Sequence, residues 1–227
     1  RYEDPGEMAA AAAARLLGLA TTAIEGRGAF HLVLAGGTTP AGVYRRLALA
    51  DADWARWHVW FGDERCLPRG HADRNDSMAR EAWLDRVPIP AGQVHSIPAE
   101  RGPVAAATAY GASLARLGDF DLVLLGLGED GHTASLFPGL PSADPAGDVA
   151  VVAVTGAPKA PPERVSLTAR RLARTHALWF LVTGSGKREA LGRLLAGDAG
   201  IPAAMVRPSA GVTIWADEAA LAGTPVG

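Results

Sequence analysis

The residues with the clearest chemical potential are 128–132, Gly-Glu-Asp-Gly-His, which follow an apolar segment from 120 to 125. A segment this short and apolar predicts a strand buried on both faces, and open α/β sheets bind ligands at the carboxyl ends of their strands. Asp130 is placed to accept a hydrogen bond from the ring of His132, or to orient its neighbourhood. A histidine held in this way can act as a general base near neutral pH.

Two other interpretations compete for this cluster. Residues 126–131 fit the dinucleotide-binding pattern G-x-G-x-x-G, but Glu129 and Asp130 would place two carboxylates where a pyrophosphate should lie. Pro138 also follows too soon for a long helix with a free amino end. The cluster could instead be a tight turn that carries a solvated histidine, and the local sequence favours that simpler interpretation until the rest of the chain is considered.

Two strand–glycine–helix junctions have the make-up of anion sites. A predicted strand from Phe30 to Ala35 runs into Gly36-Gly37-Thr38-Thr39-Pro40 and then into a helical stretch. Free N–H groups at a helix start, with two hydroxyls, suit a phosphate, although a plain turn with a threonine cap fits the same residues. The second junction, 183–187, also follows a predicted strand, and Lys187 can serve there as a point charge.

A third polar cluster, Asp63-Glu64-Arg65, ends the predicted strand from Trp57 to Gly62. Three charged residues at the carboxyl end of a strand are candidates for a site, although charged loops are usually just solvated. Cys66 beside Arg65 could have a lowered pKa, but no His–Cys spacing marks it as a nucleophile.

The composition excludes several classes of function. The 227 residues carry a formal net charge of −2 and a pI of about 6.3, which predicts no basic surface for nucleic acid. A single cysteine, Cys66, excludes an internal disulfide and fits a reducing compartment such as the cytoplasm. No apolar run reaches the expected length of a membrane span, and the Ala-rich segment around Arg15 lacks the pattern of a signal peptide.

Predicted strands and helices alternate along the chain without a repeat or a linker. The strands are predicted at 30–35, 57–62, 94–96, 120–125, 149–154, 164–167, 177–182 and 212–216. The helices are predicted at 5–25, 40–48, 78–86, 104–117, 168–173 and 187–196, with a last one capped by Asp217.

This alternation indicates one α/β domain over residues 1–227, with a mainly parallel, Rossmann-like sheet between two layers of helices. The carboxyl ends of parallel strands share one edge of the sheet, so both junctions, both acidic clusters and His132 are expected to lie together. A phosphorylated small molecule is the natural ligand for such an edge.

With these motifs in order, the chain resembles the 6-phosphogluconolactonases, in the superfamily that also holds glucosamine-6-phosphate deaminase. The matching stretches are LAGGTTP (34–40), WFGDERCLP (60–68), LGLGEDGHTASLFPG (125–139), RVSLT (164–168), TGSGK (183–187) and IWADEAAL (214–221). The long central motif is highly specific, and together the stretches span most of the chain.

The resemblance implies hydrolysis of 6-phosphoglucono-δ-lactone to 6-phosphogluconate, in the pentose phosphate pathway, without a metal or a cofactor. It implies that His132 activates a water molecule, and that Asp63 and Asp130 orient His132 or bind sugar hydroxyls. The implied partner is a phosphosugar lactone, with no nucleic acid and no membrane, and the chain is expected to be a monomer or weak homo-oligomer. The implied phosphate and sugar site consists of Gly36, Gly37, Thr38, Arg65, Arg164 and Lys187.

Three points stay open at this stage. The donor to the developing oxyanion could be Arg65 or backbone N–H groups near Gly128. The main rival activity is that of the deaminase, whose family carries a Glu before the proline where this chain has Phe137 before Pro138. A non-catalytic phosphosugar-binding module is the other alternative, which would need no His132 with acidic neighbours.

Overall fold

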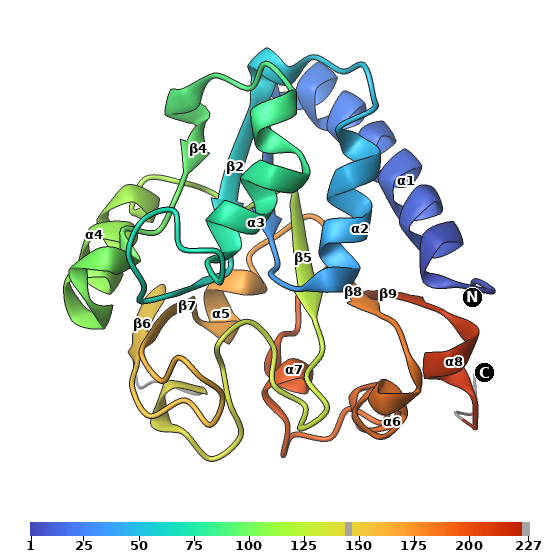
Figure 1. Ribbon diagram of the computed structural model, residues 1–227, viewed down its shortest axis with the longest axis vertical. Helices are drawn as coiled ribbons and strands as arrows, with labels where there is room; N and C mark the ends of the chain where they lie inside the picture. Colours follow the sequence, from blue (N-terminus) through green and yellow to red (C-terminus); the bar gives the residue numbers. More distant parts are fainter. Residues whose placement is uncertain (144–146, 224–227) are drawn as a thin grey trace.

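The computed structural model describes residues 1–143 and 147–223, and within them the framework is a six-stranded sheet of order β4-β2-β1-β5-β8-β9 (Figure 1). Every neighbouring pair in this sheet is parallel, which confirms the predicted mainly parallel α/β architecture. Its strands are β1 (Phe30–Leu34), β2 (Trp57–Phe61), β4 (Val94–His95), β5 (Leu122–Gly126), β8 (Leu178–Val182) and β9 (Thr213–Ala216).

A second sheet was not predicted. It is antiparallel, of order β3-β7-β6, and consists of β3 (Asp63–Arg65), β6 (Val151–Val154) and β7 (Arg164–Leu167). Strands β6 and β7 lie where the sequence predicts strands, but the predicted architecture has only one sheet and places residues 63–65 at the end of a strand instead of in one. In the structure that segment pairs with β7, with Asp63 opposite Ser166 and Arg65 opposite Arg164.

The helices cover both faces of the main sheet. The connection through α2 leads from β1 to β2, while the connection through α4 leads from β4 to β5 in the opposite direction, so right-handed crossovers place these helices on opposite faces. Figure 1 shows α1, α2 and α3 side by side, whereas α4 packs against β6 and β7. The helices are α1 (Pro5–Arg27), α2 (Thr38–Leu47), α3 (Asn75–Ala82), α4 (Pro103–Leu114), α5 (Ala169–Leu172), α6 (Arg188–Leu195), α7 (Pro202–Met205) and α8 (Glu218–Leu221).

The first helix begins as its sequence predicts. Asp4 Oδ1 accepts hydrogen bonds from the backbone N–H groups of Gly6 (2.7 Å) and Glu7 (2.9 Å), with Pro5 in the first turn. By length and mean hydropathy (1.2), α1 would suffice to cross a membrane, contrary to the expectation above. Its stripe of buried residues, which includes Met8 and Leu16, packs into the core instead, as in the core helix of a globular domain.

Two buried tyrosines fix the ends of the central strands. The hydroxyl of Tyr44, on α2, donates to the carbonyl of Ala35 (2.8 Å) and accepts from its N–H (3.0 Å). On the opposite face, the hydroxyl of Tyr110, from α4, bonds the carbonyl (3.1 Å) and the N–H (2.9 Å) of Phe61 in the same way. Both helix layers therefore anchor the points where β1 and β2 pass into the glycine-rich and charged segments.

Candidate functional site

A cavity of about 360 Å³ opens at the carboxyl ends of β1, β2, β5 and β8. Eight of the nine residues singled out by sequence line it, and the ninth, Asp130, hydrogen-bonds to one of them. The expectation that the polar clusters share one edge of the sheet is thus met in space. The eight lining residues are Gly36, Gly37, Thr38, Asp63, Arg65, His132, Arg164 and Lys187.

His132 is oriented by Asp130. Its ring Nδ1 lies 2.5 Å from Asp130 Oδ1, and the same oxygen accepts from the backbone N–H of His132 at 3.2 Å. With Nδ1 turned to the carboxylate, Nε2 is the ring nitrogen left to act on a ligand. Gly128 allows this arrangement because a Cβ there would lie 2.0 Å from Nδ1.

The surroundings keep His132 neutral. Burial lowers its pKa below the ordinary value of 6.5, by more than the hydrogen bond and charge of Asp130 raise it. The ring of Phe137, 4.6 Å away between centroids, contributes to that burial. Burial alone would raise the pKa of Asp130, but the hydrogen bond from His132 and its charge outweigh burial and lower it. A neutral histidine beside an ionised carboxylate is competent as a base at physiological pH.

Asp63 is held by different partners. Its Oδ1 accepts from Asn75 Nδ2 (3.0 Å), and its Oδ2 accepts from the hydroxyl of Ser135 (2.5 Å). Ser135 is fully buried, and Asp63 is 6 % exposed, so the carboxylate is fixed in place at the cavity wall. Neither Asn75, which also lines the cavity, nor Ser135 was singled out by sequence, because both reach Asp63 only through tertiary folding.

The first glycine-rich junction has the geometry of an anion site. Gly37 precedes α2 with φ at +103°, and no side chain caps the first turn of the helix, so its N–H groups face the cavity edge unpaired. Gly36 serves another purpose, because a Cβ there would lie 2.0 Å from the amide oxygen of Asn75. The hydroxyls of Thr39 and Thr183 approach to 2.6 Å and connect the two junctions.

The second junction is fixed by Asp217. Its carboxylate accepts from the N–H of Gly184 (3.0 and 3.1 Å) and also caps α8 through the N–H of Ala220 (2.8 Å). The sequence predicted the cap but not the contact with the loop. Lys187 lies at the end of a short 3-10 turn, η6 (Ser185–Lys187), from which its side chain lines the cavity.

The guanidinium of Arg164 is hydrogen-bonded mainly to backbone carbonyls of the protein. It donates to the carbonyls of Pro161 (3.0 Å), Lys159 (2.9 Å) and Ala160 (3.1 Å), and it lies over the ring of Phe137 at 5.5 Å. Burial lowers the pKa of Arg164. Through these bonds Arg164 fixes the segment 159–161, and Lys159, which no sequence motif marks as a site residue, lines the cavity wall.

Cys66 is not an activated thiol. Burial, together with the charges of Glu163 and Glu64, raises its pKa to about 11, opposite to the lowering that Arg65 suggested in the sequence. Across the described ranges, 1–143 and 147–223, no three His, Cys, Asp or Glu residues are grouped so as to hold a metal ion.

A parallel α/β sheet that presents a neutral histidine between two anion-type junctions defines the class of α/β enzymes that act on small phosphorylated substrates. The comparison with known proteins gives the family. The chain belongs to the glucosamine-6-phosphate isomerases/6-phosphogluconolactonases, whose family model matches residues 3–215.

Individual relatives cover nearly the whole chain. The 6-phosphogluconolactonase of Streptomyces coelicolor is 39 % identical over 97 % of this chain and 92 % of its own length. That of Rattus norvegicus is 38 % identical over 96 % and 90 %. Among solved structures, the 6-phosphogluconolactonase of Thermotoga maritima superposes with a TM-score of 0.86 at 30 % identity, over 95 % of this chain and 96 % of that one.

Proposed function

We propose that this protein hydrolyses 6-phospho-D-glucono-1,5-lactone to 6-phospho-D-gluconate in the cytoplasm, with His132 as general base and without a metal or cofactor. The observation that carries the proposal is the imidazole of His132, held by Asp130 on the wall of a cavity with two anion-type junctions. The lactonase names of the relatives support the same substrate.

The substrate phosphate is bound at the junctions. The unpaired N–H groups at the start of α2, the hydroxyl of Thr38 and the ammonium of Lys187 are donors suited to an anion. Binding energy at the phosphate, remote from the carbonyl, orients the lactone for attack.

The chemical step follows from an activated acyl group and one base. Nε2 of His132 takes a proton from water as the water oxygen adds to the lactone carbonyl, giving a tetrahedral oxyanion. The oxyanion collapses, the ring C–O bond breaks, and the departing alkoxide receives the proton from His132. The product is the open-chain acid, and His132 returns to its neutral form, so no covalent enzyme intermediate is needed.

The structure narrows the choice of oxyanion donor. The N–H of Gly128, one of the candidates from sequence, already donates to the carbonyl of His132 at 2.8 Å. Arg65 and Lys159 both line the cavity with positively charged side chains, and Lys159 is close enough to act electrostatically on His132 and Asp130. Arg65 and Lys159 are therefore the donors that we assign to the oxyanion.

The deaminase reaction is disfavoured by Phe137. In the deaminase family a carboxylate before the proline assists the histidine, whereas here a fully buried aromatic ring packs against the imidazole of His132. A phenyl ring can neither carry nor orient a proton, so it lowers the pKa of His132 without taking part in proton transfer.

A two-substrate turnover assay on the purified protein tests the proposal. In one reaction the lactone is generated by oxidation of glucose 6-phosphate, and acid release is followed above the spontaneous rate. A parallel reaction contains glucosamine 6-phosphate, and ammonia is detected. Fast lactone opening without ammonia is the expected result. Ammonia release would instead establish the deaminase, and folded protein that is silent in both reactions would establish the binding module.

A further inference from the structure

The strand β3 presents alternate residues to opposite sides. Side chains alternate along a strand, so Asp63 and Arg65 share one side and Glu64 points to the other. Asp63 and Arg65 line the cavity, whereas Glu64 is fully buried and does not line it. A carboxylate that is buried away from both solvent and ligand requires hydrogen-bond donors within the protein.

The carboxylate of Glu64 accepts hydrogen bonds from three backbone N–H groups. Oε1 accepts from the N–H of Arg65 (2.8 Å) and of Asn75 (2.8 Å), and Oε2 accepts from that of Asp76 (2.9 Å). Two of these donors form the first turn of α3, where free N–H groups and the helix dipole favour a negative charge. Glu64 thus caps α3 from a neighbouring strand.

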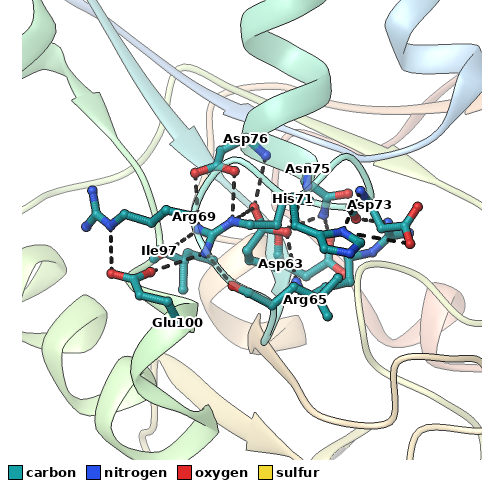
Figure 2. A network of polar contacts seen from close by, with 12 residues as sticks. Asp63, Arg65, Arg69, His71, Asp73, Asn75, Asp76, Ile97 and Glu100 are labelled. Carbon is teal, nitrogen blue, oxygen red and sulfur yellow. Dashed lines mark hydrogen bonds and ion pairs between the residues drawn. The ribbon is translucent and has the colours of Figure 1, made fainter.

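The neighbours of Glu64 are joined to the same helix start from the cavity side. Asn75 Nδ2 donates to the backbone carbonyl of Asp63 (2.8 Å) and to its carboxylate (3.0 Å). The guanidinium of Arg65 donates through Nη1 to the carbonyl of Asp73. Three consecutive residues of β3 are therefore bonded to segment 73–76, and Glu64 is the one that does not line the cavity. Figure 2 shows Asp63 and Arg65 beside Asp73 and Asn75.

Arg74 completes the support behind the site. It is 1 % exposed, and its guanidinium pairs with Asp76 through two bonds (2.9 and 3.1 Å) and with Glu100 (3.2 Å). Its Nε lies 3.7 Å from Oε2 of Glu64. Figure 2 shows this network between the start of α3 and the segment around Ile97 and Glu100. Because Glu64, Arg74 and Asn75 are all buried, displacing Glu64 is expected to move the helix start and not a single side chain.

We propose that Glu64 is a positioning residue for the reaction: its carboxylate, in ionised form, fixes Arg65 and Asn75 in the orientation that the bound substrate requires. The proposal rests on the lactonase function above. Arg65 carries the guanidinium assigned to the oxyanion, and Asn75 holds the carboxylate of Asp63, so a shift of either changes the cavity wall.

The ionised form matters because all three close partners are donors. A neutral carboxyl would have to place its own proton among N–H groups, which weakens the bonds to α3. Burial raises the pKa of Glu64 to about 7, assisted by the charge of Asp76 and opposed by the three N–H bonds. The other titratable or charged groups that face Glu64 are Arg65, Cys66, Arg74, Tyr110 and Arg164. Protonation of Glu64 therefore competes with catalysis close to neutral pH.

Glu64→Gln imitates the protonated carboxyl at every pH and is the first test. We expect kcat/KM for the lactone at neutral pH to fall by about 10–10²-fold, since small displacements of site groups cost that much. In the wild type, kcat/KM should decrease on the acidic side of the pH profile (its acidic limb) through the protonation of two groups, Glu64 and His132. In the variant it should contain one, at lower pH. An acidic limb identical to that of the wild type would overturn the proposal.

Asp76→Asn is the second test and predicts the opposite behaviour. Removing the negative charge beside Glu64 lowers the pKa of Glu64, so the acidic limb should move to lower pH while turnover near neutral pH is kept. Asp85→Asn is the charge-matched control and should leave the limb in place, because Asp85 is an exposed carboxylate in the 3-10 turn η2 (Leu84–Arg86) that follows α3 and pairs with Arg80. If Glu64→Gln does not fold, an unmoved limb in Asp76→Asn overturns the proposal.

Binding of 6-phosphogluconate separates this inference from the proposed function. Calorimetric titration across about pH 5–8 should show proton uptake or release linked to binding in the wild type and less of it in Glu64→Gln. If the wild type shows no lactone turnover, the proposed function is refuted. The positioning role of Glu64 is then tested by the proton uptake or release that accompanies binding. Turnover in the wild type, with an unchanged limb and linkage in both variants, would refute the positioning role alone.

Discussion

The imidazole of His132 is held by Asp130 and not by Asp63: Asp130 Oδ1 lies 2.5 Å from Nδ1, whereas both carboxylate oxygens of Asp63 are hydrogen-bonded to Asn75 and Ser135. Either carboxylate could have supported the histidine on sequence grounds. The two carboxylates therefore differ in their contacts: Asp130 orients the ring of His132, whereas Asp63 is a fixed acceptor on the cavity wall.

Asp130→Asn should therefore lower kcat by about 10–10²-fold, a share of the roughly 10²–10⁴-fold that a positioned base provides. The bond to Asp130 raises the pKa of His132, so its loss should lower that pKa further and move the acidic limb of the His132 step to lower pH. Asp63→Asn should move that step less, because Asp63 is the smallest contributor. Rate profiles of the two variants against pH decide between the carboxylates, and a larger shift in Asp63→Asn would contradict the assignment.

His132→Ala should remove most of the turnover, about 10²–10⁴-fold, while affinity for 6-phosphogluconate is nearly unchanged. The reason is that the anion donors at the two junctions do not depend on the imidazole. Steady-state kinetics together with calorimetric titration of the product check both parts. A turnover close to wild type would exclude His132 as the base.

Much of this site was accessible from sequence because its signals are local. The His132–Asp130 contact spans two residues, and the Gly36–Thr38 and 183–187 junctions each occupy a single turn between a strand and a helix. The features that the sequence did not predict depend on contacts formed in the tertiary structure. β3 became a strand because it pairs with β7 a hundred residues later, and the commitment of Arg164 to segment 159–161 follows from how that segment folds back.

Gly128→Ala should disable the site through a steric effect alone. A Cβ at this position would lie 2.0 Å from His132 Nδ1 and 2.5 Å from Asp130 Oδ1, so the pair must move apart. We expect a loss of kcat comparable with that of Asp130→Asn, at nearly unchanged thermal stability. Gly18→Ala, where nothing lies within 4 Å of the new Cβ, is the matched control and should retain full activity. Normal kcat in Gly128→Ala would show that the pair tolerates displacement.

Lys187→Ala and Arg164→Ala should both raise KM more than they lower kcat, since Lys187 is the proposed phosphate ligand and Arg164 fixes segment 159–161 of the cavity wall. They should differ in stability. Lys187 has its side chain at the cavity, whereas Arg164 is 5 % exposed and donates to three carbonyls, so its loss removes hydrogen bonds from a charged group at a cost of about 1.5–3 kcal/mol. Thermal unfolding beside the kinetics makes the distinction, and a fall in kcat alone would place either residue on the transition state.

The histidines His31, His58 and His95 should make the fold sensitive to acid. They lie on neighbouring strands, with His31 and His58 stacked at 4.6 Å and His58 Nδ1 3.2 Å from His95 Nε2. Burial, chiefly, lowers the pKa of each, and that of His95 falls to about 4. Near pH 6.5 and below, these histidines bind more protons in the unfolded chain than in the folded one. Their contribution therefore lowers the free energy of unfolding as the pH is decreased from about 6.5 to about 4.

His95→Gln should flatten this decline, which denaturant unfolding across about pH 4–7 would measure. Glu64, whose pKa is raised, acts in the opposite direction over the same range, so the informative quantity is the difference in slope between variant and wild type. His176→Gln, an exposed histidine outside the group, serves as the control. Equal slopes in wild type and His95→Gln would mean that the stacked histidines are protonated without cost to the fold.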